Sequence, residues 1–324
     1  MKLPRMGLGC MNLSHAYGVP PTPEEGEALL RAALDDGVTF LDTATLYGGG
    51  RNEELVGRAI AGRRDEVILA SKCVMAMVDG VKVIDGRPEN IRAQVDASLG
   101  RLGVDHIDLY YLHRWDKKVP IAESVGALAE AVEAGKIGAI GLSEVSVARL
   151  REAQTVAPIA AVQNEYSLWT RNAELGMLEA TRADGIALVA FSPVARGFLA
   201  NGVSDPATLA EKDIRRAMPR FQGENWAANA RLLPAWNALA DEAGCTPAQL
   251  ALAWLLSRGE HVVPIPGTTS IAHLREDFAA VEVGVDPALL ERAGDLISHS
   301  TVTGPRYNAV NSSEVDAETF EDAA

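Results

Sequence analysis

Short apolar runs alternate with amphipathic stretches along most of the chain. Runs such as Ile107 to Leu112 and Ile186 to Phe191 are apolar at nearly every position, which is typical of strands buried on both faces. Between such runs lie stretches with an apolar stripe at helical spacing, as in Leu29 to Leu34. Turn formers such as Gly37 separate the two patterns. The pattern therefore predicts strands and helices in alternation.

Eight strands are predicted, and helices fill the gaps between them. One strand precedes Cys10, and the others end at Asp42, Lys72, His113, Ser143, Gln163, Phe191 and Ile265. Helices are expected after the caps Thr22 and Asn52 and over 88–102, 121–134, 148–153, 174–183, 226–243, 247–257 and 271–279. Eight buried parallel strands with interleaved helices predict an α/β fold, the (β/α)8 or TIM barrel, in a single domain.

A doubly wound open sheet is the alternative architecture for this order of elements. It requires a Gly-x-Gly-x-x-Gly turn between a strand and a helix. Gly7-Leu8-Gly9 lacks the third glycine, and no helix follows it directly. The barrel is therefore favoured for residues 1–304. Residues 305–324 are polar and acidic and are predicted to form a flexible C-terminal tail.

Composition narrows the class of protein further. The 324 residues are 48% apolar and carry a formal net charge of -14, which argues against a nucleic-acid partner. The chain shows no apolar run long enough for a membrane span, and no signal sequence. Its three cysteines are far apart in sequence, as expected in a reducing compartment. We expect a cytoplasmic protein, either a monomer or a homo-oligomer.

Polar side chains gather at the ends of the predicted strands. Asp42, Lys72 and His113 end three neighbouring strands, and Tyr47 lies in the loop after the first. Taken singly, each has an ordinary structural role as a turn former, a solvated charge or a packed ring. Barrel enzymes place their active sites at the carboxyl ends of the strands. The four residues together therefore predict one site.

Proton affinities indicate what such a site can do. A tyrosine with a pKa of about 10 keeps its proton at neutral pH. A nearby ammonium from Lys72 stabilises the phenolate, and Asp42 can hold that lysine in place and protonated. His113 can orient a carbonyl oxygen beside Tyr47. These residues can protonate a carbonyl oxygen while a hydride reaches its carbon, which implies a nicotinamide cofactor.

The same residues lie in segments that resemble the aldo-keto reductases. The resemblance runs in unbroken order from about residue 3 to residue 280. It is carried by Phe40-Leu41-Asp42-Thr43-Ala44, Tyr47-Gly48, Ser71-Lys72, Asp108 to Arg114, Gly135 to Gly138, Gly141-Leu142-Ser143, Gln163 to Tyr166, Phe191-Ser192-Pro193 and Ile265 to Thr268.

This resemblance implies NADPH bound across the C-terminal mouth of the barrel and a catalytic tetrad of Tyr47, Asp42, Lys72 and His113. Ser143 and Gln163 would bind the nicotinamide carboxamide, and Phe191 would stack on its ring. The full set of implied cofactor contacts is Gly9, Cys10, Met11, Asp42, Ser143, Glu144, Gln163, Phe191, Ser192, Pro193, Val194, Arg196, Gly197, Ile265, Pro266, Gly267, Thr268, Thr269, His273, Glu276 and Asp277.

Two departures from the family pattern concern the cofactor. Glu144 stands where an asparagine is common, and the segment after Gly267 lacks the usual cation for the 2′-phosphate, which leaves NADH possible. His273 lies where a phosphate-binding arginine is often found. The stretch Lys212 to Phe221 carries four cations. It can fold over the cofactor and add phosphate contacts, or it can be a solvated loop.

The substrate is expected to be a small carbonyl compound. The predicted pocket consists of Met11, Tyr47, His113, Arg114 and Trp115, with Tyr17, Trp169 and Trp226 as further candidates. Indole rings in this pocket would favour aromatic or apolar aldehydes and ketones. The predicted activity is reduction of an aldehyde or ketone to an alcohol by hydride transfer from NADPH.

Three other functions are compatible with part of this pattern. A nicotinamide-binding regulatory subunit could keep the whole tetrad. A Schiff-base lyase could use Lys72, but Asp42 and Tyr47 would then be poorly explained. A metal hydrolase is disfavoured, because His113 has no partner at ligand spacing, and no metal is predicted.

Overall fold

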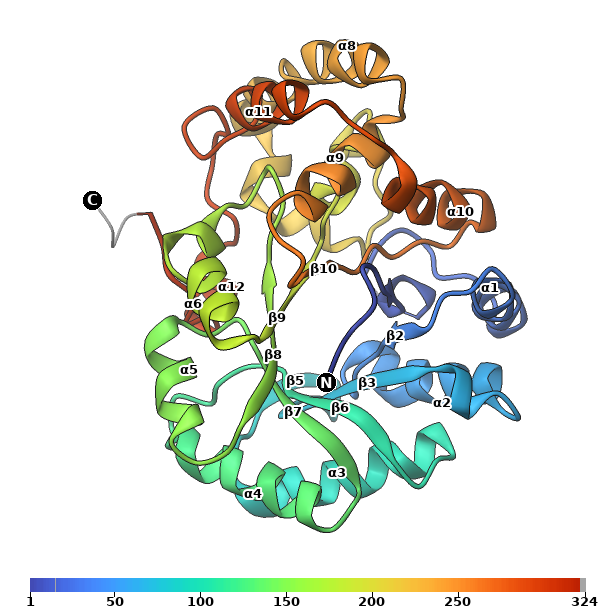
Figure 1. Cartoon of the computed structure of the whole chain (residues 1–324), viewed down its shortest axis with the longest axis vertical. Coiled ribbons are helices and arrows are strands. Elements are labelled where there is room, and N and C mark those ends of the chain that lie inside the picture. The colour runs from blue at the N-terminus through green and yellow to red at the C-terminus, as the bar shows by residue number, and fades with distance from the viewer. Residues whose placement is uncertain (15, 321–324) are drawn as a thin grey trace.

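Eight parallel strands form one curled sheet in the computed structural model, which describes residues 1–14 and 16–320 (Figure 1). The strands follow the chain in the order β1-β2-β3-β6-β7-β8-β9-β10. They are β1 (Leu8–Gly9), β2 (Phe40–Asp42), β3 (Ile68–Cys73), β6 (Ile107–Leu112), β7 (Ile137–Ser143), β8 (Ile159–Glu165), β9 (Ala187–Phe191) and β10 (Val262–Pro264). All eight predicted strands are present.

Two backbone hydrogen bonds join the first and last strands. Gly7 N donates to Pro264 O at 3.0 Å, and Gly9 N donates to Pro266 O at 2.9 Å. A Cβ atom on Gly9 would lie 2.9 Å from Ile265 O, so the close approach needs glycine. The sheet is thus closed, and the predicted (β/α)8 barrel is confirmed.

Side chains alternate along the strands between the barrel interior and the helices. Phe40, Leu109 and Val189 belong to a cluster inside the barrel, whereas Leu41 and Tyr110 pack with the surrounding helices. All five are completely buried. Both faces of each strand are therefore apolar, which explains the continuous apolar runs in the sequence.

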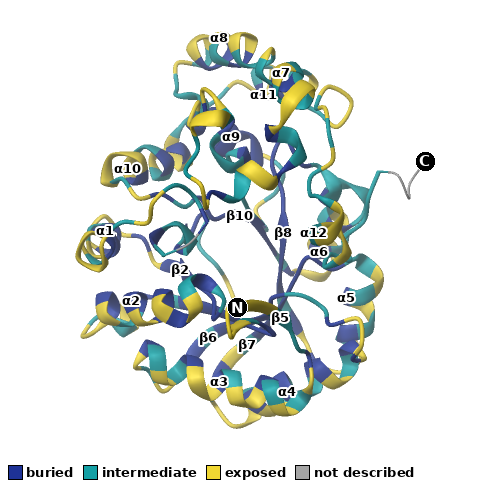
Figure 2. Cartoon of the chain, turned by 180° about the vertical axis from the view of Figure 1, so that it is seen from behind, coloured by how far each residue is buried: buried dark blue, intermediate teal, exposed yellow. Residues whose placement is uncertain are grey.

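Helices surround the sheet, with buried inner faces and exposed outer faces (Figure 2). Thr22 and Glu25 form the expected capping box at the first helix. The helices are α1 (Pro23–Asp35), α2 (Arg51–Ile60), α3 (Pro88–Leu102), α4 (Ile121–Glu133), α5 (Val147–Gln154), α6 (Met177–Asp184), α7 (Gly223–Ala230), α8 (Leu233–Ala243), α9 (Pro247–Leu256), α10 (Ile271–Ala279), α11 (Pro287–Leu296) and α12 (Ala309–Ser313).

The structure differs from the prediction in three places outside the barrel strands. The predicted helix 226–243 is two helices, because Pro234 lies in the first turn of α8. Helix α11 was not predicted, although Asp286 caps it and Pro287 begins it. An antiparallel hairpin, β4 (Met75–Val78) and β5 (Val81–Ile84), was also not predicted.

The C-terminal segment, residues 305–320, differs from the predicted flexible tail. It contains α12 and is fixed to the barrel by side-chain contacts at several points along its length. Asp316 accepts hydrogen bonds from Ser146, and Glu318 accepts one from Val147 N at 2.6 Å. Polar composition alone suggested a loose tail, but these acidic side chains find partners at the N-terminus of α5. Residues 321–324 lie outside the described part of the chain.

Within residues 1–14 and 16–320, no helix is both long enough and apolar enough to cross a membrane.

Candidate active site

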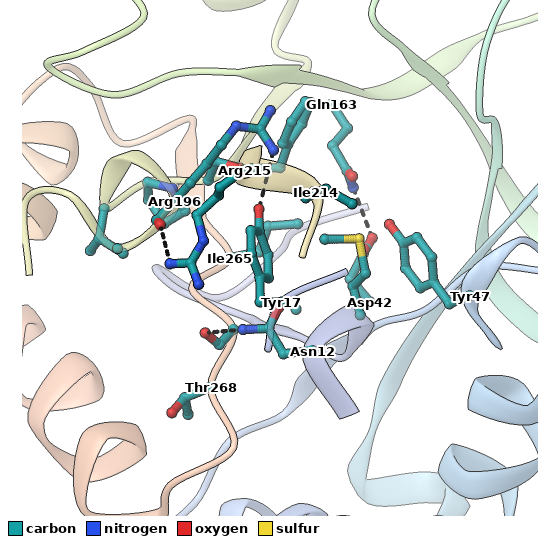
Figure 3. A pocket seen from close by; sticks show the side chains of 18 of the residues that line it. Asn12, Tyr17, Asp42, Tyr47, Gln163, Arg196, Ile214, Arg215, Ile265 and Thr268 are labelled. Carbon is teal, nitrogen blue, oxygen red and sulfur yellow. Dashed lines mark hydrogen bonds between the residues drawn. The ribbon is translucent and has the colours of Figure 1, made fainter. Parts of the chain in front are cut away.

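A cavity of about 630 Å³ opens at the carboxyl ends of the strands (Figure 3). Most of the predicted site residues line it. They are Gly9, Met11, Asp42, Tyr47, His113, Arg114, Ser143, Gln163, Phe191, Ser192, Pro193, Val194, Arg196, Gly197, Ile265, Gly267, Thr268, Thr269, His273, Glu276 and Asp277. The barrel thus brings residues from distant parts of the sequence to one mouth.

Lys72 forms the buried centre of the polar groups at this mouth. Its ammonium lies 2.5 Å from Asp42 Oδ1 and 3.3 Å from the Tyr47 hydroxyl, and it also donates to Thr43 O at 2.9 Å. Strands β2 and β3 pair in parallel, so their carboxyl ends place Asp42 and Lys72 together. The second oxygen of Asp42 accepts a hydrogen bond from Gln163 Nε2 at 2.8 Å.

Burial and neighbouring charges shift the pKa values of Lys72 and Tyr47 in opposite directions. Burial alone would lower the pKa of Lys72, but Asp42 and Tyr47 raise it above the usual lysine value. Burial raises the pKa of the Tyr47 phenol, and the Lys72 charge opposes that rise. Lys72 is therefore charged at neutral pH, and Tyr47 keeps its proton.

His113 packs against Tyr47 at the inner end of the cavity. The two rings meet edge to face, with centroids 5.7 Å apart and planes at 85°. His113 follows β6 directly, and its backbone N donates to Cys73 O at 3.2 Å. The imidazole and the phenol thus flank one point of the cavity wall, as the spacing of the strand ends predicts.

Arg114 lies beside this pair and contacts the end of the next strand. Its Nη1 donates to His113 O at 2.6 Å and to Ser143 Oγ at 3.3 Å. No carboxylate of residues 1–14 and 16–320 forms an ion pair with it. The other cations that line the cavity (Lys82, Arg196 and Arg215) are each paired with an acidic side chain.

The loop that follows β9, residues 192–222, crosses the cavity and is called the covering loop. Ser192, Ala195 and Arg196 have φ values of 52°, 53° and 59°, so the backbone turns sharply here. Further along, Ile214 N donates to Ala16 O at 3.0 Å, and Asp213 accepts from Gly18 N at 2.8 Å. The cation-rich stretch therefore folds over the cavity, and the phosphate contacts expected of it stay a prediction.

The outer end of the cavity lies at the start of α10. Thr268, Thr269 and His273 line it, together with the carboxylates of Glu276 and Asp277. Burial, with a smaller contribution from Glu276, raises the pKa of Asp277 to about 7. Asp277 therefore changes charge near neutral pH.

A few predicted site residues do not line the cavity. Cys10, Pro266 and Lys72 lie behind its wall, although Lys72 touches Tyr47. Trp115 packs under Arg149 and donates to Val119 O at 2.9 Å. Glu144 is fully buried and is bound by Arg306 and by the backbone N of Glu165. The predicted indole-rich pocket is wrong, because Trp169 and Trp226 also lie outside the cavity lining.

Several lining residues were missed by sequence reasoning. Asn12 is one of them and donates to Gly267 O at 2.9 Å. Others come from the β4–β5 hairpin and the C-terminal segment, neither of which was assigned to the site. These are Lys82, Tyr307, Asn311 and Glu314. The cation-rich stretch 212–221, which contains Arg215, is the part of this wall that the sequence did indicate.

No group of three or more His, Cys, Asp or Glu side chains in the described part of the chain is arranged to hold a metal ion. A closed parallel barrel with a buried Asp-Lys-Tyr contact beside a cavity at its carboxyl mouth has the architecture of a barrel enzyme. Residues 5–292 match the sequence profile of the Aldo/keto reductase family. The chain belongs to this family and is an NADP-dependent oxidoreductase.

Individual relatives agree with this assignment. The chain is 41% identical over 312 residues to the aldo-keto reductase yakc [NADP(+)] of Schizosaccharomyces pombe, covering 94% of this chain and 92% of that protein. A glycerol dehydrogenase of Gluconobacter oxydans has a similar structure, with a TM-score of 0.83, 29% identity and 94% of both chains covered. An aldo-keto reductase of Bacillus halodurans in its holo form gives a TM-score of 0.72 at 26% identity, covering 92% and 93%.

Proposed function

We propose that this protein reduces an aldehyde or ketone to an alcohol with NADPH, and that Tyr47 donates the proton. The observation that carries the proposal is the contact of one buried ammonium, Lys72, with both Asp42 and Tyr47. The phenol faces the cavity, where a carbonyl oxygen can reach it. His113 flanks the same point and orients that oxygen.

The cavity fits the cofactor. Its inner end offers Asp42, Ser143 and Gln163 for a ribose and a carboxamide, and Phe191 supplies an aromatic face. The sharply turned backbone of the covering loop and Arg196 suit a pyrophosphate. When bound, NADPH supplies the hydride that reaches the carbonyl carbon.

Each residue of the tetrad has one task in the proposed reaction. Tyr47 transfers its hydroxyl proton to the carbonyl oxygen as that oxygen gains charge. Lys72 stabilises the phenolate that remains, and Asp42 keeps Lys72 protonated. One carbonyl, one hydride and one proton give one alcohol, and the phenolate regains its proton from solvent.

The high pKa of Lys72 argues against the lyase alternative, because a Schiff base requires a neutral amine. The inner end of the cavity bears an arginine, Arg114, that has no carboxylate partner in the described residues. We propose that polar carbonyl compounds suit it better than the aromatic ones that the tryptophans suggested.

Turnover of 4-nitrobenzaldehyde with NADPH tests the proposed function. The reaction is measured as the decrease in NADPH absorbance. Parallel assays with NADH give the cofactor preference. The proposal predicts oxidation of NADPH that depends on the aldehyde. Tight NADPH binding without turnover of any carbonyl compound would instead support the regulatory-subunit alternative.

A further inference from the structure

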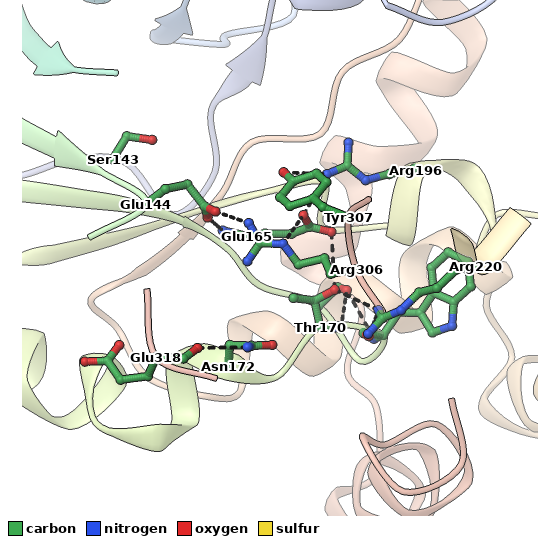
Figure 4. Close-up of polar contacts among 12 residues, drawn as sticks. Ser143, Glu144, Glu165, Thr170, Asn172, Arg196, Arg220, Arg306, Tyr307 and Glu318 are labelled. Atoms are coloured by element: carbon green, nitrogen blue, oxygen red, sulfur yellow. Dashed lines mark hydrogen bonds and ion pairs between the residues drawn. The ribbon is translucent and has the colours of Figure 1, made fainter. Parts of the chain in front are cut away.

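Four charged side chains form a buried cluster between the barrel mouth and the C-terminal segment (Figure 4). They are Glu144 at the end of β7, Glu165 at the end of β8, Arg196 in the covering loop and Arg306 in the C-terminal segment. Their side chains are 0%, 4%, 7% and 12% exposed, respectively. Charges buried to this degree must be compensated locally, so the cluster must stay balanced.

Arg306 connects the two carboxylates. Its Nη2 donates to Glu144 Oε2, and its Nε lies 3.1 Å from Glu165 Oε2. The same oxygen of Glu165 accepts from Arg196 Nη2 at 2.6 Å. Arg196 also donates to the hydroxyl of Tyr307, next to Arg306, at 3.0 Å. The position of Arg196 in the cavity wall therefore depends on a residue of the C-terminal segment.

Glu144 links the cluster to the inner end of the cavity. It directly follows Ser143 and has a φ of 56°, a conformation that is costly for a residue with a side chain. Its N donates to Gln163 O at 3.0 Å, and its Oε1 accepts from Glu165 N at 2.8 Å. The carboxylate thus fixes how β7 and β8 end, where Ser143 and Gln163 face the cavity.

Two further guanidinium groups face the cluster, and both are bound by other partners. Arg114 donates to His113 O and Ser143 Oγ. Arg220 is nearby, but it donates to Trp169 O, Thr170 Oγ1 and Gly304 O. Removal of Arg306 leaves Glu165 paired with Arg196 and leaves Glu144, within the described residues, with no ion-pair partner. The charged or titratable groups that face the cluster from all sides are Arg114, Tyr17, Arg220, Tyr307 and Asp316.

We propose that Arg306 is a positioning residue of the NADPH site. Through Glu144 it fixes the strand ends that carry Ser143 and Gln163, and through Glu165 it fixes Arg196. Glu144 is then not a carboxamide ligand but the anchor of the C-terminal segment. The inference rests on the proposed function only in taking the ligand to be NADPH.

Binding of NADPH without a carbonyl substrate tests the inference, measured by quenching of tryptophan fluorescence. We expect Arg306→Met to raise the Kd at least about tenfold, because the uncompensated carboxylate of Glu144 distorts the ends of β7 and β8. Wild-type protein that neither binds nor oxidises NADPH would refute the proposed function rather than this inference.

The double variant Glu144→Gln, Arg306→Met separates positioning from simple loss of a contact. It leaves Glu165 paired with Arg196 and no uncompensated charge at residue 144, so we expect a Kd within about threefold of wild type. A double variant as weak as Arg306→Met, or a wild-type Kd in the single variant, would overturn the inference.

Glu318→Ala is the matched control, since it removes the hydrogen bond from Val147 N at the other end of the same segment and leaves the cluster intact. We expect wild-type binding, and a loss equal to that of Arg306→Met would refute a specific role for the arginine. If Arg306→Met does not fold, Arg306→Lys replaces it. The lysine keeps the charge but cannot bridge both carboxylates, so binding should weaken less than in Arg306→Met. Unchanged binding in that variant would contradict the bridging role.

Discussion

The ammonium of Lys72 donates a hydrogen bond to the Tyr47 hydroxyl over 3.3 Å, although both side chains are buried. Without a cofactor, burial outweighs the lysine charge and raises the pKa of the phenol. The phenol is thus fully protonated over the physiological pH range. In the proposed reaction Lys72 acts when Tyr47 gives up its proton, because its ammonium then stabilises the phenolate.

Replacement of Tyr47 by phenylalanine should abolish most of the reduction and spare cofactor binding. The variant retains the ring that packs against His113 but lacks the proton donor. We expect kcat to fall about 10²–10⁴-fold. NADPH binding by fluorescence should stay within about twofold of wild type, because the hydroxyl contributes only one weak contact.

Tyr166→Phe is the control for this change. It also removes a buried tyrosine hydroxyl, but one that donates to Glu174 away from the cavity. It should leave kcat unchanged. Comparable reduction by the Tyr47 and Tyr166 variants would assign the proton donor to another group.

Replacement of Asp42 by asparagine should move the alkaline limb of the pH–rate profile to lower pH. Burial lowers the pKa of Lys72, and Asp42 is the largest influence that raises it again. The same carboxylate also raises the pKa of Tyr47. Without it, both groups lose their protons at lower pH, and reduction requires both protons. A limb that stays in place or moves upward in kcat measurements would contradict the role given to Asp42.

The barrel could be predicted because its signal is distributed over the whole chain. Each strand is buried on both faces, so each appears as an apolar run whatever its neighbours are. The hairpin β4–β5 gave no such signal, since Met77, Val78 and Val81 are exposed. Strand-forming residues without a buried face are difficult to distinguish from a loop.

The inner site could be predicted for a related reason. Asp42, Lys72 and His113 are placed by the strands that they end, and parallel strands end at one mouth. The contribution of the C-terminal segment could not be predicted in this way. Arg306 meets Glu144 across 162 positions of sequence, and no local pattern encodes such a contact. The tryptophans were wrongly assigned to the substrate pocket, because a tryptophan that packs in the core cannot be distinguished in the sequence from one that binds substrate.

Arg114 should favour substrates with a carboxylate next to the carbonyl carbon. Phenylglyoxylate and its methyl ester are a matched pair that differ in that charge. We expect wild-type kcat/KM to be about tenfold higher for the acid, and Arg114→Met to remove the difference mainly through KM. The ester serves as the internal control, since its reduction should change little. A preference for the ester in wild-type protein would contradict the substrate class and leave the reductase activity itself intact.

Asp277 should make NADPH affinity fall as the pH rises through about 7, the pKa to which burial raises its carboxyl group. Below that pH the side chain is neutral. Above it, a carboxylate lines the same end of the cavity as His273, where the family resemblance implies the 2′-phosphate. Dissociation constants for NADPH and NADH, measured by fluorescence from pH 5.5 to 8.5 (a range of about 1.5 units on either side of that pKa), check this expectation. NADH lacks the phosphate, so its affinity should change little over the range. Asp277→Asn should bind NADPH more tightly than wild type at the alkaline end and equally at the acidic end. A pH step of the same size in that variant, or an equal fall for NADH, would show that Asp277 does not set the cofactor preference.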